Sequence, residues 1–143
     1  MTAHGTTAFS ARFDRDVAAR LEARSARAGV NKSKLAERYV DEGTRMDEHP
    51  GIVFRDGPTG RRAALAGGPD VWEVVATFKS GSTRGEAAIP ELAEILELSI
   101  GQVQIALGYY AAYPEEVDER VARHLADADE AEAAWRRTQA AIS

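Results

Sequence analysis

The sequence predicts a mainly α-helical protein: a front part of one short strand and two helices, then a small helical part that contains a short hairpin. Near the N-terminus apolar residues alternate with a period of two, as in a strand. Farther on, apolar residues recur at helical spacing between glycines and prolines. A chain of 143 residues with 44% hydrophobic and 29% charged residues falls in the range of soluble globular proteins.

Residues 6–14 (TTAFSARFD) form the expected strand. A lone strand leaves backbone groups unpaired on both edges, and no second strand is expected in the front part. We therefore expect a second copy of the protein to supply the antiparallel partner, which makes a two-stranded ribbon of the kind that fits the DNA major groove. The inward positions would be Phe9, Ala11 and Phe13, and the outward positions Ala8, Ser10 and Arg12.

Two helices are expected after the strand. The first lies between Asp14, a favourable N-cap, and Gly29, a typical residue after a helix end. The second is expected to begin at Asn31 or Ser33 and to end at Gly43.

A linker rich in Gly and Pro is expected to lead into the hairpin. Its strands are predicted from the apolar run Ile52–Phe54 and from Arg61–Leu65. A helix follows, with Pro69 at its start and Gly81 at its end.

Three more helices complete the predicted fold. Pro90 is expected to open a short helix, Ser99 to cap one over residues 100–112, and Pro114 to open the last one. The residues expected to share a face of the middle helix are Val103, Leu107 and Tyr110. The apolar stripe of the last helix comprises Val117, Val121, Leu125, Ala128 and Trp135.

Charge differs between the two parts. Residues 1–46 hold nine Lys/Arg and six Asp/Glu, which gives +3, whereas residues 47–143 hold nine and seventeen, which gives −8. A basic front part suits phosphate, and an acidic rear part suits protein contacts because nucleic acid repels it. Ordinary scatter in composition is the alternative explanation.

Several classes of function are excluded or disfavoured. The absence of cysteine excludes disulfides, thiolate catalysis and cysteine-ligated metals. The three histidines lie at least 45 residues apart, and no phosphate-binding loop or nucleophile elbow occurs. We therefore expect no enzyme, no metal and no cofactor. The N-terminus is unlike a secretion signal and no apolar run is long enough for a membrane span, so the cytoplasm is the expected location.

The stretch AFSARFDRDVAARLEARSARAGVNKSKLAERYVDEG resembles the ribbon-helix-helix family of the Arc, MetJ and CopG type. The resemblance covers residues 6–46, which would form the DNA-binding and dimerisation domain. It rests on the strand ending in Arg-Phe, the turn AGVNKS, and four apolar positions: Val17, Leu21, Leu35 and Tyr39.

The resemblance implies two groups of DNA contacts. In the family the outward strand residues read base edges, which assigns this role to Ala8, Ser10 and Arg12. Arg12 can hold guanine bidentately, whereas Ala8 offers only apolar contact to a thymine methyl group. The family also places the start of the second helix on a phosphate, here Asn31, Lys32, Ser33 and Lys34. The alternative is that Arg12 is merely solvated.

Residues 49–121 resemble a small helical domain of unknown function found in bacterial antitoxins of VapB type. The matching stretches are HPGIVFRDGPTGRRAALAGGPDVWEVVATFKSG and LSIGQVQIALGYYAAYPEEVDE, whereas residues 82–98 depart from the family pattern. The resemblance implies an antitoxin that binds its own operator as a homodimer or higher even oligomer and neutralises a toxin similar to PIN-type ribonucleases. A stand-alone ribbon-helix-helix regulator, or an interaction module that does not bind DNA, are the alternatives.

Residues 115–143 form the predicted C-terminal helix, a candidate toxin-binding arm. Trp135, Arg136 and Arg137 have the composition of an interface hot spot, and arginine suits the clustered carboxylates that the resemblance implies for the toxin. The alternative is that Trp135 packs on the dimer or on its own rear part.

Overall fold

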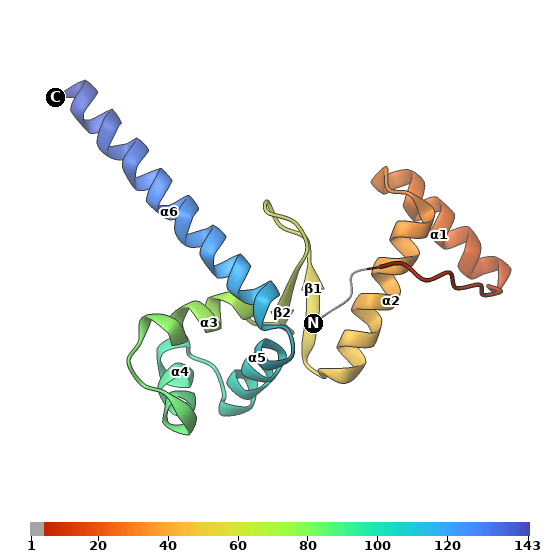
Figure 1. The fold of residues 1–143 in the computed structure, drawn as a ribbon, viewed down its shortest axis with the longest axis horizontal. Coiled ribbons are helices and arrows are strands. Elements are labelled where there is room, and N and C mark those ends of the chain that lie inside the picture. The colour runs from red at the N-terminus through yellow and green to blue at the C-terminus, as the bar shows by residue number, and fades with distance from the viewer. Residues whose placement is uncertain (1–4) are drawn as a thin grey trace. The chain divides into compact units, whose positions relative to one another are not determined.

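The computed structural model describes residues 5–143, and most of them are helical, as the sequence predicts (Figure 1). The elements in chain order are α1 (Arg15–Ala28), α2 (Lys32–Glu48), β1 (Ile52–Arg55), β2 (Arg62–Leu65), α3 (Val71–Ser80), the 3₁₀ helix η1 (Gly85–Ala87), α4 (Ala88–Leu96), α5 (Ile100–Ala112) and α6 (Pro114–Ile142).

The chain divides into two compact units, which we call the front unit, up to Asp41, and the rear unit, from Glu42 onward. The boundary falls inside α2. In the described part of the chain, no helix is both long and apolar enough to cross a membrane.

α1 begins and ends as predicted. The Asp14 carboxylate accepts a hydrogen bond of 2.9 Å from the amide of Asp16 and so caps the first turn. Gly29 adopts the left-handed conformation (φ 63°) that glycine enters at little cost, and its amide donates to the carbonyl of Ser25.

α2 begins as predicted but ends later. Asn31 is the N-cap, because its side chain accepts a 2.8 Å hydrogen bond from the amide of Ser33. The prediction that Gly43 ends the helix is wrong: α2 continues through Gly43 to Glu48. Within the rear unit the continuing turns are held by side chains, since Arg45 donates to the hydroxyl of Tyr109 at 2.8 Å.

Residues 5–14 form neither helix nor strand in the single chain, and their side chains are exposed. The predicted strand is expected to form only by pairing with a second copy, which a single chain does not contain, so it stays a prediction.

The predicted hairpin is present in the rear unit. β1 and β2 pair antiparallel, with Ile52 opposite Leu65 and Arg55 opposite Arg62. Ile52 and Leu65 are buried, whereas the two arginines are half-buried.

Two prolines lie at different helical positions from those predicted. Asp70, not a residue before it, is the N-cap of α3, so Pro69 precedes the helix instead of opening it. α4 begins at Ala88, two residues before Pro90, and the 3₁₀ turn η1 leads into it. A proline is accommodated there because the first turn of a helix has no intrahelical acceptor for its amides.

The hydrophobic core of the rear unit lies among the hairpin, α3, α5 and the start of α6. Its fully buried large side chains include Leu65, Val71, Val74, Val75 and Tyr109. A second cluster, formed by Leu92, Ala93 and Val103, joins α4 to α5. The buried face of α5 comprises Val103, Ala106 and Tyr109, so the predicted face is correct at Val103 and rotated by one residue beyond it.

The first turns of α6 are packed and its remainder is not. Val117 and Val121 are buried, whereas every residue from Leu125 to the C-terminus is exposed. Figure 1 shows this second part of α6 extending away from α3 and α5.

Candidate DNA-binding and dimerisation surface

The front unit carries an open apolar groove of about 460 Å³. It lies between the segment before α1, one face of α1 and one face of α2. Its lining residues are Phe13, Val17, Arg20, Leu21, Arg24, Ala36, Tyr39 and Val40. Because the groove is almost entirely apolar, covering it would remove a large hydrophobic area from water.

The front unit has almost no core of its own. Among residues 5–41, only Leu35 is buried, and no side chain of α1 is. Two helices with one buried side chain between them expose most of the apolar surface that would otherwise hold them together. α1 and α2 therefore expose apolar surface that no other part of the front unit covers.

The aromatic residues of the N-terminal segment are exposed. The side chain of Phe9 is 89% exposed and that of Phe13 is 56% exposed. Phe13 also lines the apolar groove. Large exposed aromatic side chains of this kind are typical of surfaces that a protein partner covers.

The predicted base-reading residues lie in the same segment. Ala8, Ser10 and Arg12 are all exposed, and they alternate with Phe9, Ala11 and Phe13. Ala8, Ser10 and Arg12 lie near one another because they are close in sequence, and no secondary structure of the described chain aligns them.

The predicted phosphate-binding residues lie together at the start of α2, where Asn31, Lys32, Ser33 and Lys34 are all exposed. The Asn31 side chain already accepts from the amides of Ser33 (2.8 Å) and Lys34 (3.4 Å). A phosphate at this helix end would therefore rely on the ammonium groups of Lys32 and Lys34 and on the Ser33 hydroxyl, or would displace Asn31. The pair between Lys34 and Glu37, at 3.9 Å and well exposed, holds Lys34 only weakly.

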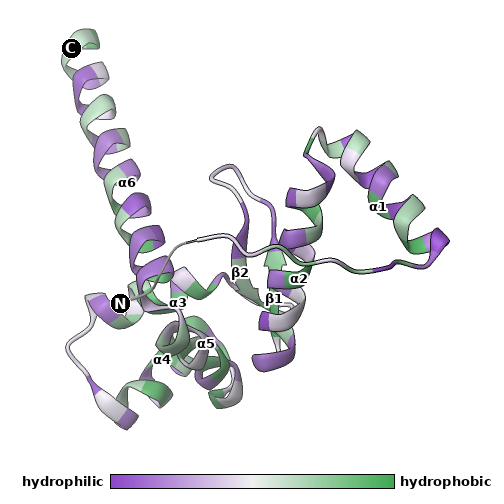
Figure 2. Ribbon diagram, turned by 45° about the vertical axis from the view of Figure 1, so that its right-hand side comes forward, coloured by the Kyte–Doolittle hydropathy of each residue, from purple (hydrophilic) through white to green (hydrophobic). Residues whose placement is uncertain are grey.

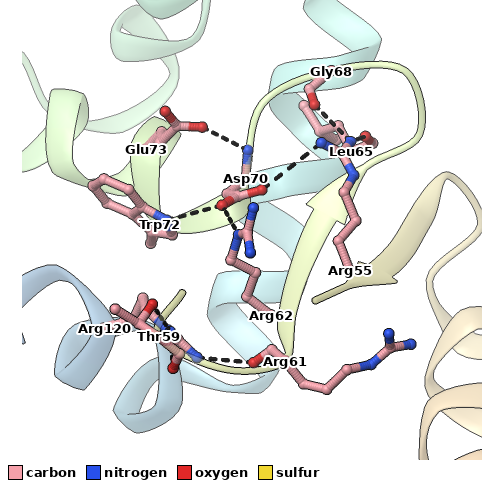
Figure 3. Close-up of polar contacts among 10 residues, drawn as sticks. All are labelled: Arg55, Thr59, Arg61, Arg62, Leu65, Gly68, Asp70, Trp72, Glu73 and Arg120. Atoms are coloured by element: carbon pink, nitrogen blue, oxygen red, sulfur yellow. Dashed lines mark hydrogen bonds and ion pairs between the residues drawn. The ribbon is translucent and has the colours of Figure 1, made fainter. Parts of the chain in front are cut away.

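The rear unit contains a polar network centred on the buried carboxylate of Asp70 (Figure 3). The carboxylate accepts from the Arg62 guanidinium and from the indole N–H of Trp72 at 3.1 Å, and Arg55 lies 3.9 Å from it. Arg55 also donates to the carbonyl of Leu65, at the end of β2, at 2.6 Å, and to that of Gly68 in the loop after it at 2.7 Å. Gly57 completes the arrangement, because a Cβ there would lie 1.6 Å from Nη1 of Arg62. The network fixes the hairpin to the start of α3.

Two further arginines connect the ends of the rear unit to the hairpin. Arg61 holds the buried carboxylate of Glu42 with two hydrogen bonds of 2.9 and 2.5 Å. The hydrogen bond to Glu42 raises the pKa of Arg61 above its ordinary value. Arg120 of α6 donates to Thr59 and to the carbonyl of Arg61 (Figure 3). These contacts are structural, because each guanidinium is held by groups of its own unit. Sequence reasoning did not find them, because no local pattern pairs an arginine with a distant acceptor.

A second network joins the end of α2 to α5 and α6. Arg45 donates to the Tyr109 hydroxyl and to Glu116, both at 2.8 Å, and Tyr109 donates to Glu116 at 2.6 Å. Burial and the hydrogen bond to Glu116 raise the pKa of Tyr109 well above its ordinary value. Burial lowers the pKa of Arg45, but the hydrogen bonds to Glu116 and Tyr109 outweigh it, so the net shift is upward.

α4 and α5 are joined in a way that resembles a helix-turn-helix motif. Three residues connect them, and the first, Glu97, is left-handed (φ 55°). However, the sequence between Arg84 and Arg120 holds eight Asp/Glu and no Lys/Arg. A segment with this charge is repelled by the phosphate backbone, so the candidate DNA surface belongs to the front unit alone.

The predicted partner-binding residues lie on the exposed part of α6. The side chain of Trp135 is 60% exposed, and Arg136 donates to Glu132 of the same helix at 2.5 Å. Packing of Trp135 on its own rear unit, one of the two alternatives considered, is thereby excluded in the single chain.

In the comparisons with known proteins, no protein-family model, no curated protein and no solved structure matches this chain. Within residues 5–143, no group of three or more His, Asp or Glu side chains is placed to hold a metal ion.

Proposed function

We propose that this protein is a ribbon-helix-helix antitoxin, which binds its own operator DNA as a dimer and neutralises a PIN-like ribonuclease toxin. The observation that carries the DNA-binding dimer is the apolar groove of the front unit, which exposed Phe13 lines, together with the exposed Phe9 four residues earlier in the chain. In the proposed dimer the strand of residues 6–14 pairs with its copy, and the aromatic side chains of both copies enter the two grooves.

Ribbon formation gives the outward residues of the strand their role. With Phe9 and Phe13 turned inward, Ser10 and Arg12 face the major groove, because successive side chains of a strand point to opposite faces. The Arg12 guanidinium then reads a guanine, and Lys32 and Lys34 neutralise phosphates beside it.

The antitoxin role rests on the rear unit. It holds ten Lys/Arg and eighteen Asp/Glu over residues 42–143, a net charge of −8, whereas residues 1–41 hold eight and five, a net charge of +3. An acidic unit attached to a basic one favours a protein partner for the former and nucleic acid for the latter. A stand-alone regulator remains the second candidate, since the front unit supports it equally well.

Operator binding is tested by titrating the full chain onto the DNA upstream of its own gene. Arg12→Ala is expected to weaken specific binding by about 1–3 kcal/mol and to relax the base preference, whereas Lys32→Ala weakens binding to all sequences and reduces its salt dependence. Arg123→Ala, which removes the same charge from the rear unit, is the matched control. Unchanged operator affinity in Arg12→Ala would show that the strand is not the reader.

The toxin is tested by co-expressing the chain with any nuclease encoded beside it. The antitoxin role predicts that the two proteins co-purify and that growth is rescued. Growth rescue that persists in Arg12→Ala would separate neutralisation from DNA binding. Specific operator binding without any such partner would instead support the stand-alone regulator.

A further inference from the structure

α6 carries a seven-residue repeat that runs from its packed turns into its exposed part. Val121, Ala128, Trp135 and Ile142 are spaced seven residues apart, and Leu125, Glu132 and Gln139 fill the second position of each repeat. The stripe begins in the core of the rear unit at Val121 and continues, uncovered, to the end of the helix. Figure 2 shows hydrophobic and hydrophilic residues interleaved along α6.

A stripe of this form fits another helix. A seven-residue repeat keeps its apolar positions on one side of a helix that coils around a partner. From Leu125 to Ile142 the stripe is about 26 Å long at 1.5 Å per residue. Most of the stability of a protein helix comes from tertiary packing of its apolar face, and these residues have no such packing within the described chain.

We propose that residues 125–142 of α6 pair in antiparallel orientation with the same segment of a second copy of this chain. In the register that aligns the two stripes, Leu125 lies opposite Ile142 of the second copy. Ala128 then lies opposite Gln139, and Glu132 opposite Trp135.

The charges of α6 are complementary to themselves in this orientation. Asp129 and Arg136 follow Ala128 and Trp135 of the stripe by one residue, so they lie on the same flank. The antiparallel register brings Asp129 of each copy near Arg136 of the other. Arg136 already donates to Glu132 of its own helix at 2.5 Å. A guanidinium has five N–H donors, so Arg136 can donate to the second carboxylate as well.

The parallel orientation is less favourable. It would stack Glu132 on Glu132 within the stripe and place like residues opposite each other at every layer, which costs energy for the paired carboxylates. The antiparallel register instead places each Glu132 beside a Trp135 and near an arginine.

Cysteine cross-linking tests the orientation, since the chain has no cysteine of its own. The full-length double variant Ala128→Cys/Gln139→Cys is expected to form covalent dimers on mild oxidation or with a short bis-maleimide, whereas Ala128→Cys alone is not. Covalent dimers of Ala128→Cys alone would indicate parallel pairing and overturn the proposal. The absence of cross-linking in both variants would overturn it too, and would leave a toxin or another protein as the occupant of the stripe.

Charge exchange tests the ion pairs independently. Asp129→Arg or Arg136→Asp alone is expected to lower the cross-linked yield or the self-association constant about three- to tenfold, and the double exchange to restore it. Exchanging Glu130 and Arg137, which lie on the outward side, is the control and should change little. Helix content is measured in every variant, so that loss of pairing is distinguished from loss of the helix. Failure of the double exchange to restore pairing in fully helical protein would contradict the register.

Self-association through α6 can be measured separately from dimerisation of the front unit. In a Phe13→Asp background the front-unit interface of the proposed function is expected to be lost, so that sedimentation reports α6 alone. Dimers that persist in this background and disappear with Asp129→Arg support the proposal. A monomer in this background, with residues 125–142 still helical, overturns it without bearing on the ribbon.

Discussion

Asp70 is a charged residue in a buried position, where an unpaired charge would be strongly destabilising. Its side chain is almost fully buried, yet it lies within reach of Arg55, Arg62 and Trp72. Removing one member of a buried ion pair leaves the others desolvated and uncompensated. Asp70 therefore stabilises the rear unit because it accepts hydrogen bonds from Arg62 and Trp72.

Asp70→Ala is expected to lower the free energy of unfolding by about 3–5 kcal/mol, because Arg62 and the Trp72 indole lose their acceptor. Asp56→Ala is the matched control, since its carboxylate is 78% exposed and pairs with Arg61 at 3.4 Å. The control should cost less than about 1 kcal/mol. Urea unfolding of both variants measures the difference, and equal losses would contradict the role assigned to the network.

Tyr109 gives the rear unit a dependence on alkaline pH. Its pKa is raised in the folded chain, so the folded state keeps the hydroxyl proton that the unfolded state loses near pH 10, at about the ordinary tyrosine pKa. This contribution is therefore complete below about pH 10 and is lost as the pH rises toward the folded pKa.

Unfolding measured on both sides of pH 10 should show a steeper loss of stability for the native chain than for Tyr109→Phe. The variant lacks the titrating group but keeps the ion pair between Arg45 and Glu116. Parallel pH profiles for the two proteins would show that Tyr109 does not contribute to the alkaline loss.

At the scale of elements, helix ends with local chemistry were predicted correctly. Asp14 and Gly29 bound α1, Ser99 caps α5 with a reciprocal contact from Gln102, and Pro114 opens α6. Each of these signals acts within a few residues, so the sequence alone contains it.

Ends that depend on tertiary contacts were predicted incorrectly. Gly43 is a weak helix former, but the turn beyond it is held by Arg45 against α5 and α6, which no local pattern reveals. The same limit applies to the candidate site. The alternation of Phe9 and Phe13 indicated an uncovered apolar face, whereas the groove that Phe13 lines required the packing of α1 on α2.

Packing around Gly43 leaves room for a side chain, so it does not require glycine there. Gly43 lies inside α2, and a Cβ there would meet nothing within 4 Å. Gly43→Ala is therefore expected to stabilise the protein by about 0.8–1 kcal/mol, the difference in helix propensity. Gly29→Ala is the contrasting variant, since its left-handed backbone should make the substitution destabilising by about 1–2 kcal/mol. Thermal unfolding distinguishes the two signs, and a destabilising Gly43→Ala would imply a role for the glycine that helix propensity does not include.

At the scale of the whole molecule, the two units have different sources of stability. The rear unit has a buried core and several ion-pair networks, whereas Leu35 is the only buried side chain among residues 5–41. If a second copy covers the front groove, the stability of the front unit depends on protein concentration by mass action.

Hydrogen exchange at low and high protein concentration is expected to separate the units. Protection of α1 and of residues 32–41 should rise with concentration, while protection of α3 and α5 should not. Phe13→Asp should abolish the rise. Protection of the front unit that is independent of concentration in the native chain would mean that no second copy stabilises it.

The fluorescence of the two tryptophans reports on two different parts of the rear unit. Trp72 stacks on the imidazole of His124 with ring centroids 3.8 Å apart, so its emission reports the junction between α3 and α6. Trp135 is largely exposed, so its emission should shift to shorter wavelength when anything covers the end of α6. Because the front unit has no tryptophan, operator binding should leave this spectrum nearly unchanged, whereas engagement of α6 should alter it.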